Sequence, residues 1–392
     1  MPKTFLTVLF LTVVINTGMG MLIPVLPTLL KDFGFSTVGL SLPFAALIIA
    51  RIVSKPWAGI ALGRFGGRKL MLVVFVVYSL AFFLYPFCNN PVGFIALRVL
   101  EGFAEGVGGV ILTDYAIAMT AGRKDRGKLM GYFSAAFGLG FIIGPMIGWA
   151  ALEAFGVVGM FLIGGAVGLL GVFASVILPH RYSKSASSRA SIKQLADNVV
   201  YLIPYIPSVL RRALFFSFMI IVPLFATERL GLSAEKVGLL FTASGIITTV
   251  FMPFTGKLAD RFDPKALTIW CLVGMGVLIG IFGYTDSIET FLVFFMAETF
   301  LFTIMLPAGT KLFADAVDSH PLRGPMIGSF GSFTEVFTVF LAFLIPAILD
   351  FSLTGSWLFL GGLCIFGALL LLQWRPELML ENKSLKEAKA EA

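Results

Sequence analysis

Charged residues are scarce in this chain, where they make up only 13% of 392 residues. Soluble globular domains carry about 25% charged residues, so this composition excludes a fold whose whole surface faces water. The mean hydropathy of +0.96 supports the same exclusion. We therefore expect most of the chain to face lipid, and its length fits about 12 helices of about 20 to 25 residues.

Cysteine and histidine are also nearly absent, with three and two residues. The cysteines lie in or beside apolar runs, which predicts neither a disulfide framework nor a metal site. Both histidines fall in expected loops, so proton chemistry inside the membrane must depend on carboxylates. We find no phosphate-binding glycine loop and no segment long enough for a soluble ATPase domain. These absences argue against an enzyme, a receptor or a nucleotide-driven pump, and we expect no cofactor.

A repeat across the two halves is the strongest positive feature. The run Gly59–Phe65 recurs as Gly256–Phe262, at a spacing of 197 residues. The same offset pairs Glu101 with Glu298, Arg126-Gly127 with Arg323-Gly324, and Gly131 with Gly328. In so apolar a chain, two copies of one unit predict a transporter with its site between the repeats.

Hydrophobic runs predict an all-α membrane protein with 12 transmembrane helices in two pseudo-symmetric six-helix bundles. We expect the first bundle within 1–179, a linker over 180–208, the second bundle within 209–375 and a tail over 376–392. The expected helices are 4–30, 37–62, 70–88, 91–119, 128–152, 156–178, 209–229, 235–259, 265–285, 288–316, 325–349 and 354–374. The first run is too long for the core of a signal peptide, so we interpret it as a retained helix.

Basic residues predict the orientation. They gather in the loops after the second, fourth and eighth expected helices and in the linker, while the opposite loops hold few. The positive-inside rule then places both termini and the linker in the cytoplasm. The net charge of +7 is explained in this way without a nucleic-acid partner.

Three motifs resemble the major facilitator superfamily. The run Gly59–Lys69 is similar to the family's signature between helices two and three, and Arg98 with Gly102 is similar to its helix-four signature. The helix-five run Gly131, Gly140, Gly144-Pro145 and Gly148 is similar to the pattern of the 12-helix drug/proton antiporters. The stretch Gly18–Pro27 also resembles helix one of tetracycline and fluoroquinolone exporters. The resemblance implies a functional monomer in the cell (inner) membrane, with a proton gradient as its energy source.

Four departures from these patterns bear on mechanism. Gly63 replaces the acid of the loop signature, whereas Asp260 keeps it in the second half. Met119 stands where the exporters have an acid near the end of helix four, and Asn16 stands where the tetracycline group has one in helix one. Trp149 replaces the last glycine of the helix-five pattern. We expect the cytoplasmic closure of the first half to be weaker or built otherwise.

The resemblance assigns gating to the loop signatures of both halves and to the glycines and proline of helix five. Gly140 and Gly144 share one helix face, where they allow close helix packing, and Pro145 bends the helix. Simple packing is the alternative role. The full set of gating candidates is Gly59, Gly63, Arg64, Arg68, Gly140, Gly144, Pro145, Gly148, Gly256, Asp260 and Arg261.

Charges inside the expected helices mark candidate sites. Arg98, Glu101 and Glu105 lie three and four residues apart and so share one helix face. Arg98 can neutralise one carboxylate, which leaves the other as a proton acceptor or as a group that faces water. Glu298 and Glu335 have no cation nearby in sequence, and each can hold a proton or contact a cationic substrate. Our candidate proton-coupling residues are Arg98, Glu101, Glu105, Glu298 and Glu335.

The candidate substrate contacts mix charged and apolar groups. Arg51 and Lys55 share a face of the second expected helix, where Arg51 can meet Glu105, Asp114 or an anionic substrate, and we favour a structural role for Lys55. Arg211 and Arg212 are expected to anchor helix seven at the interface. The candidates are Asn16, Arg51, Glu101, Tyr115, Met305 and Glu335.

These observations predict a proton-coupled exporter of small amphipathic molecules or drugs, an antiporter that works by alternating access. Its expected partners are a small-molecule substrate, protons and the lipid bilayer. One alternative is an exporter of an anionic metabolite, siderophore or lipid-linked glycan, with Arg51 and Arg98 as the anion contacts. The other is a proton symporter, against which the helix-five pattern argues by resemblance.

Overall fold

The first half of the chain folds into long helices joined by short turns. In this computed structural model the described residues are 3–22, 42–88, 90–179, 198–232, 234–318 and 320–375. The elements of the first half are α1 (Lys3–Leu22), α3 (Leu42–Phe65), α4 (Gly67–Leu84), the short η2 (Tyr85–Phe87), α5 (Pro91–Thr120) and α6 (Arg126–Ser175). Local sequence sets their limits: Asn90 caps α5 by accepting a hydrogen bond from the Gly93 amide at 2.7 Å, and Pro91 occupies the first helical position.

The second half repeats this pattern. Its elements are η3 (Val199–Tyr205), α8 (Ile206–Leu224), η4 (Phe225–Arg229), α9 (Ala234–Arg261), α10 (Pro264–Phe282), α11 (Ile288–Val317), α12 (Arg323–Leu349) and α13 (Leu353–Gln373). Helical structure begins at Val199, so the last ten residues of the expected linker are helical. The predictions for 23–30, 37–41, 180–197 and 376–392 lie outside the described residues.

The 50-residue helix α6 crosses the membrane twice. A straight helix of that length would span about 75 Å, well over the ~30 Å hydrocarbon core. The chain reverses at Gly156, whose φ of 67° and ψ of −172° leave the helical region. The glycine permits a positive φ without the steric cost that a side chain would add. The expected pair of helices, five and six, therefore corresponds to the two arms of α6.

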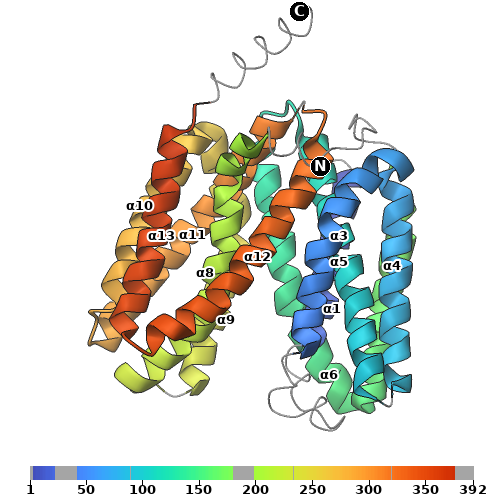
Figure 1. Ribbon diagram of the computed structural model, residues 1–392, viewed down its shortest axis with the longest axis horizontal. Coiled ribbons are helices and arrows are strands. Elements are labelled where there is room, and N and C mark those ends of the chain that lie inside the picture. The colour runs from blue at the N-terminus through green and yellow to red at the C-terminus, as the bar shows by residue number, and fades with distance from the viewer. Residues whose placement is uncertain are drawn as a thin grey trace, which may run out of the picture.

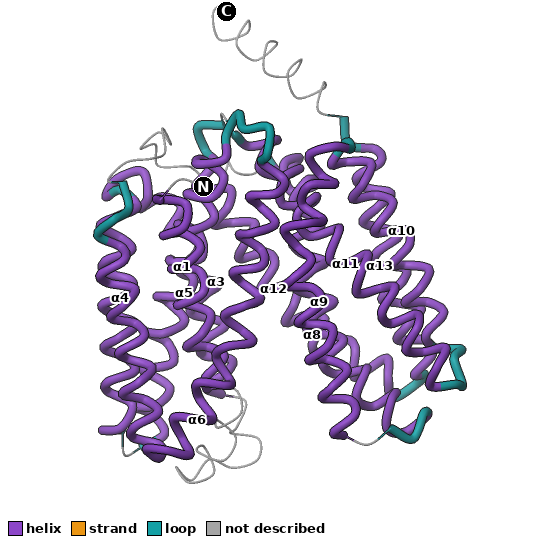
Figure 2. The backbone as a smooth tube through the Cα atoms, turned by 180° about the vertical axis from the view of Figure 1, so that it is seen from behind, coloured by secondary structure: helices purple, strands orange, loops and turns teal. Residues whose placement is uncertain are grey.

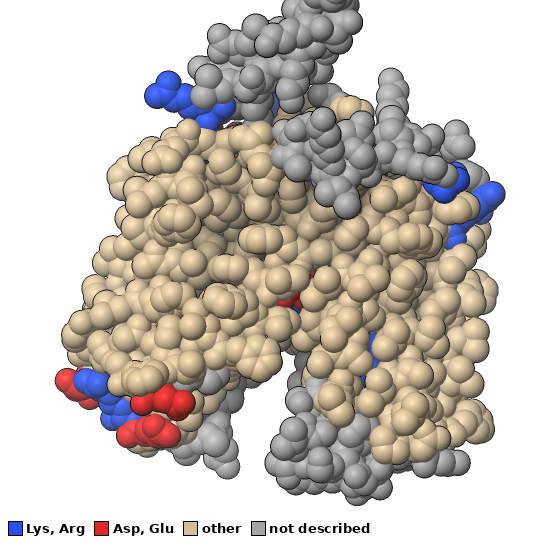
Figure 3. Space-filling view, viewed as in Figure 1, with Lys and Arg blue, Asp and Glu red and all other residues tan. Residues whose placement is uncertain are grey.

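The surface matches a membrane environment. Ten helices among the described residues are long and apolar enough to cross a bilayer, with the long α6 counted once. The 30-residue α5 is also long enough, although it carries three charged residues in its first half. Large apolar side chains point outward, such as Phe343 at 77% and Trp270 at 74% exposure. Most of the charged side chains visible on the face shown in Figure 3 lie at its two ends, and only small charged areas appear between them, next to the junction of the two bundles.

The helices form two bundles that meet at one end and diverge at the other (Figures 1 and 2). One bundle contains α1 to α6 and the other α8 to α13. Between the bundles, α6 packs on α9 and α3 packs on α12. We name the end with the turns at 121–125 and 320–322 the closed end, and the opposite end the open end. A notch enters between the bundles from the open end in the space-filling view (Figure 3).

Glycines at the bundle interface follow the sequence repeat. A Cβ on Gly59 would collide with the backbone of Gly324, and one on Gly256 would collide with the backbone of Gly127. Both members of the second pair lie 197 residues from their counterparts in the first, with Gly59 corresponding to Gly256 and Gly127 to Gly324. The two contacts are therefore equivalent under the pseudo-symmetry that the sequence predicts. Only a residue without a side chain allows backbones to approach so closely.

Candidate functional site

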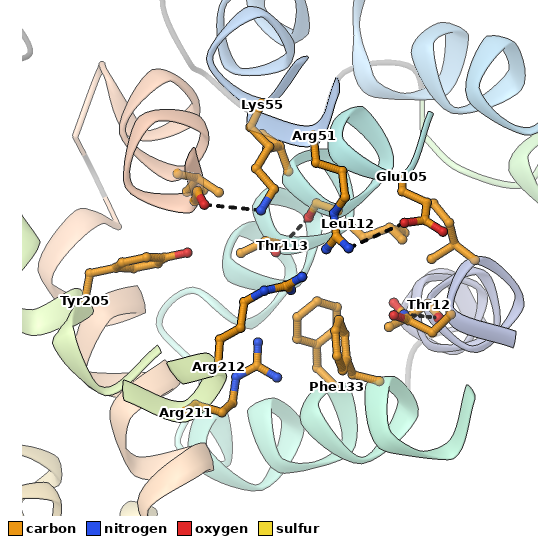
Figure 4. Close-up of a pocket in the computed structure, with 17 residues that line it drawn as sticks. Thr12, Arg51, Lys55, Glu105, Leu112, Thr113, Phe133, Tyr205, Arg211 and Arg212 are labelled. Carbon is orange, nitrogen blue, oxygen red and sulfur yellow. Dashed lines mark hydrogen bonds and ion pairs between the residues drawn. The ribbon is translucent and has the colours of Figure 1, made fainter. Parts of the chain in front are cut away.

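A polar cavity lies between the bundles near the middle of the molecule. Its volume is about 140 Å³, and side chains from α1, α3, α5, α6, η3, α8 and α12 line it. Figure 4 shows Arg51 and Glu105 on one side and Arg211 and Arg212 on the other, with Phe133 beside the two arginines of the second pair. The cavity therefore combines charges of both signs with an aromatic surface.

Glu335 is the centre of an ion cluster that joins the bundles. Its Oε1 lies 2.6 Å from Lys55 Nζ and 3.1 Å from Arg51 Nη2, and its Oε2 lies 3.0 Å from Arg212 Nη2. The Glu335 side chain is 2% exposed. The sequence showed no cation near this residue, yet the fold brings three. Lys55 also donates to the Gly331 carbonyl at 3.2 Å, so it spans the interface between the two bundles.

Glu105 is held far less completely than Glu335. Its Oε2 lies 3.6 Å from Arg51 Nη1, beyond hydrogen-bond distance. Its Oε1 is buried and has no hydrogen-bond partner among the described residues. A buried carboxylate without full pairing is costly to keep ionised. Of the two carboxylates that the sequence offered to Arg51, besides an anionic substrate, Glu105 is the one that lies near it.

Arg98 and Glu101 pair in the interior of the first bundle. Arg98 Nη1 lies 3.0 Å from Glu101 Oε2, to which the Tyr85 hydroxyl also donates at 2.7 Å. Both charged residues are buried, and neither lines the cavity. The hydroxyl of Tyr78 and Oε1 of Glu101 are buried without a partner among the described residues. Polar atoms of this kind are usually satisfied by internal water.

The remaining candidates are dispersed. Asn16 lines the cavity and donates to the Thr12 carbonyl at 2.7 Å. Tyr115 lies elsewhere and donates to the Pro179 carbonyl at 2.6 Å, while Met305 is fully buried in the core of the second bundle. Glu298 is 4% exposed, lies outside the cavity, and forms no ion pair in the described part of the chain.

Arg211 and Arg212 are cavity residues that the sequence placed at the membrane interface. Both line the cavity, and Arg212 reaches the ion cluster. The Arg211 guanidinium lies 4.8 Å from the centre of the Phe137 ring. The early start of the helical segment, at Val199, explains the difference. Because helical structure begins ten residues before the expected start, both arginines lie well inside the helical segment instead of in its first turn.

Charged contacts between the bundles hold the closed end. Asp260 on α9 accepts from the amides of Gly127 at 2.5 Å and Lys128 at 2.9 Å, the first residues of α6. Arg126 reaches Asp315 at 2.7 Å across the same interface. A carboxylate at a helix N-terminus satisfies unpaired amides and complements the helix dipole.

The first half builds its closure differently, as Gly63 led us to expect. Asp114 on α5 pairs with Arg323 of α12 at 2.7 Å, and both side chains are buried. Under the 197-residue repeat Arg323 corresponds to Arg126, so this ion pair is the counterpart of the one between Arg126 and Asp315, while Gly63 has no carboxylate to match that of Asp260. Among the other motif residues, Arg64 and Arg261 are exposed, and Arg68 is half-buried.

The helix-five glycines pack against α1. A Cβ on Gly140 would approach the Cβ of Asn16 to 2.6 Å, and Gly144 and Gly148 face the backbones of Gly20 and Met21 in the same manner. Pro145 contacts the same stretch of α1. This face therefore holds α1, a helix that lines the cavity, directly against α6.

Comparisons with known proteins agree with this architecture. The family model of the Major Facilitator Superfamily matches residues 8–220 and 206–391. The chain is 25% identical over 372 residues to Multidrug resistance protein 2 of Bacillus subtilis (strain 168), covering 92% of each chain. It is 26% identical over 354 residues to Quinolone resistance protein NorA of Staphylococcus aureus (strain MRSA252), covering 89% of each.

Solved structures share the fold at low identity. The human organic anion transporter MFSD10 (TETRAN) has a TM-score of 0.74 at 17% identity, covering 95% of this chain and 100% of that chain. The transporter FucP in the outward conformation has a TM-score of 0.78 at 12% identity, covering 95% and 99%. These likenesses show the arrangement of helices alone.

Two helical repeats around a polar cavity at membrane depth define a membrane transporter. The chain belongs to the Major Facilitator Superfamily. It is accordingly a multi-pass transporter and not an enzyme. Members of this family bind small-molecule substrates and are typically monomeric.

Proposed function

We propose that this protein exports small amphipathic molecules across the cell membrane by alternating access, and that protons moving inward drive the export. The names of the two relatives concern resistance to multiple drugs and to quinolones, which supports a drug-like cargo. The basic residues at the closed end support a cytoplasmic location for that end and for both termini.

Glu105 is the observation that carries the proposal. It lines the cavity, one of its oxygens has no partner among the described residues, and its nearest cation is 3.6 Å away. A proton or a basic group of the substrate can each satisfy this carboxylate, but not both together. Such competition makes proton binding and substrate binding exclude each other, which is the requirement for exchange.

Glu101 and Glu298 are the supporting carboxylates. Glu101 lies one helical turn from Glu105 and contacts the buried Arg98 and Tyr85. Glu298 is the counterpart of Glu101 in the second bundle, and the described residues supply it with no ion-pair partner. We propose that the protonation of Glu105 depends on Glu101 and its partners Arg98 and Tyr85. We also propose that Glu298 remains protonated through the transport cycle.

Transport by purified protein in liposomes under an imposed pH gradient tests the proposal. With an acidic interior, fluorescent amphipathic dyes should accumulate inside, and collapse of the gradient should abolish accumulation. Glu105→Gln should remove the dependence on the gradient, while the matched control Glu153→Gln, at an exposed position of α6, should behave as wild type. Gradient-driven accumulation by Glu105→Gln at the wild-type rate would overturn the assignment.

A further inference from the structure

Arg211 presents an uncompensated charge to the cavity. It forms no ion pair and no hydrogen bond within the described part of the chain, although it lies beside Phe137 at 4.8 Å. Figure 4 shows Arg211 and Arg212 extending from α8 into the same space, opposite Arg51 and Glu105. Arg212 contacts Glu335 at 3.0 Å, and its buried Nε has no hydrogen-bond partner among the residues that the structure describes.

The cavity as a whole carries more positive than negative charge. Its cations are Arg51, Lys55, Arg211 and Arg212, and the carboxylates that meet them are Glu105 and Glu335. Guanidinium groups stay protonated in proteins, so the excess stays positive even when the lysine is neutral. Uncompensated charge at membrane depth is costly, and Glu335 already serves three cations. An anion in the cavity would offset this cost.

The wall around the arginines is apolar and partly aromatic. Phe133 and Phe137 line the cavity from α6, and Ile15 and Val110 line it from α1 and α5. A ring system can lie against these side chains while its charged substituent reaches the guanidinium groups. Arginine suits this task because its planar group binds a carboxylate or sulfonate through two parallel hydrogen bonds and stacks on aromatic faces.

From this geometry we propose that Arg211 and Arg212 form a subsite for an anionic group of the substrate, so that the transported molecules are aromatic or otherwise amphipathic acids. The assignment rests on the proposed function and names the substrate class of that same cavity. A basic group on such a molecule, where present, reaches Glu105 on the opposite bundle. One molecule then contacts both bundles, and this bridging favours their approach at the open end.

Binding of three dyes with one fluorophore tests the subsite. Dansyl sulfonate is anionic, dansyl amide is neutral, and a dansyl derivative with a trimethylammonium group is cationic. The purified full chain in detergent should bind the sulfonate at least tenfold more tightly than the amide, as read from the rise in dansyl fluorescence. Arg211→Gln should weaken sulfonate binding about tenfold, equal to about 1.4 kcal/mol, and leave amide binding unchanged.

Controls separate the subsite from a folding effect and from a general anion site. Unchanged amide binding shows that the cavity of Arg211→Gln is intact, and Arg229→Gln, at an exposed position, should retain the wild-type preference. Arg211→Lys should restore part of the affinity. Equal binding of sulfonate and amide by the wild type, an unchanged preference in Arg211→Gln, or full displacement by equimolar inorganic sulfate would each overturn the proposal.

The dye-binding experiment tests the subsite separately from the proposed function because binding in detergent needs no pH gradient. A tenfold preference for the sulfonate without movement driven by a pH gradient would support the subsite and contradict proton coupling. Gradient-driven transport with no preference among the three dyes would support proton coupling and contradict the subsite.

Discussion

The charge of Glu335 is neutralised by residues that lie far from it in the sequence. Its three cationic partners belong to α3 and α8, and two of them lie about 280 residues away in sequence. Local sequence patterns do not reveal such contacts. The sequence therefore identified Glu335 as a candidate site residue but did not show which cations neutralise it. The pairing of Arg98 with Glu101 was predictable because both lie on one helix at a three-residue spacing.

Removal of the Glu335 charge should destabilise the protein. Glu335→Gln leaves three buried cations without their common anion, and we expect the free energy of unfolding to fall by about 3 kcal/mol. Thermal denaturation of the purified protein in detergent measures the change. Arg229→Gln breaks only the exposed pair with Asp286 and should cost about 1 kcal/mol or less. Equal melting temperatures for the two variants would contradict the central role of this cluster.

At the scale of single elements, the helix-five glycines set the distance between α1 and α6. Gly140→Ala would place a Cβ 2.6 Å from that of Asn16 and 2.7 Å from the Val13 carbonyl oxygen. Because backbone atoms cannot yield easily, we expect a loss of about 2 kcal/mol in stability, together with reduced transport. Thermal denaturation and liposome transport measure the two effects.

The matched control for this substitution lies in α13. A Cβ on Gly362 meets no atom within 4 Å, so Gly362→Ala should be neutral or stabilising by up to about 1 kcal/mol, through its higher helix propensity. If both variants were equally stable, close packing would not explain the glycine at position 140.

The contact between Asp260 and α6 should bias the conformational equilibrium. Asp260→Asn weakens two hydrogen bonds to the first amides of α6, and we expect the closed end to open more often by a factor of about five, or about 1 kcal/mol. Distances between spin labels at the exposed positions Lys124 and Phe262, on opposite bundles, report this change. Asp350→Asn, at the open end, should leave the distance distribution unaltered, and an equal shift in both variants would reject the assignment.

The elements differ in how far their sequences predicted them. Hydrophobic runs located the helices because that signal is local. The 197-residue repeat relates the two glycine contacts at the interface to each other, but which glycines meet is known only from the structure. The start of the second bundle was less predictable. Residues 199–208 include two prolines and flank a polar stretch, so local signals favoured a linker, whereas tertiary packing makes Val199–Tyr205 helical. That difference moved Arg211 and Arg212 from the expected membrane surface into the cavity.

For the whole molecule, orientation decides whether the notch faces outside or inside, and labelling can establish it. Basic residues cluster at the closed end, so we expect that end to face the cytoplasm. Asp286→Cys, at the open end where the side chain is 79% exposed, should react with a membrane-impermeant maleimide in intact cells. Lys124→Cys, exposed at the closed end, should react only after permeabilisation. Cys88→Ser provides the background because Cys271 and Cys364 are buried. With that orientation, the notch of the proposed exporter faces the outside in this structure, which is the side where substrate is released. The reverse labelling pattern would make this the substrate-loading state of an exporter. The closed-end contacts of Asp260 with α6, of Arg126 with Asp315 and of Asp114 with Arg323 would then form the outer gate.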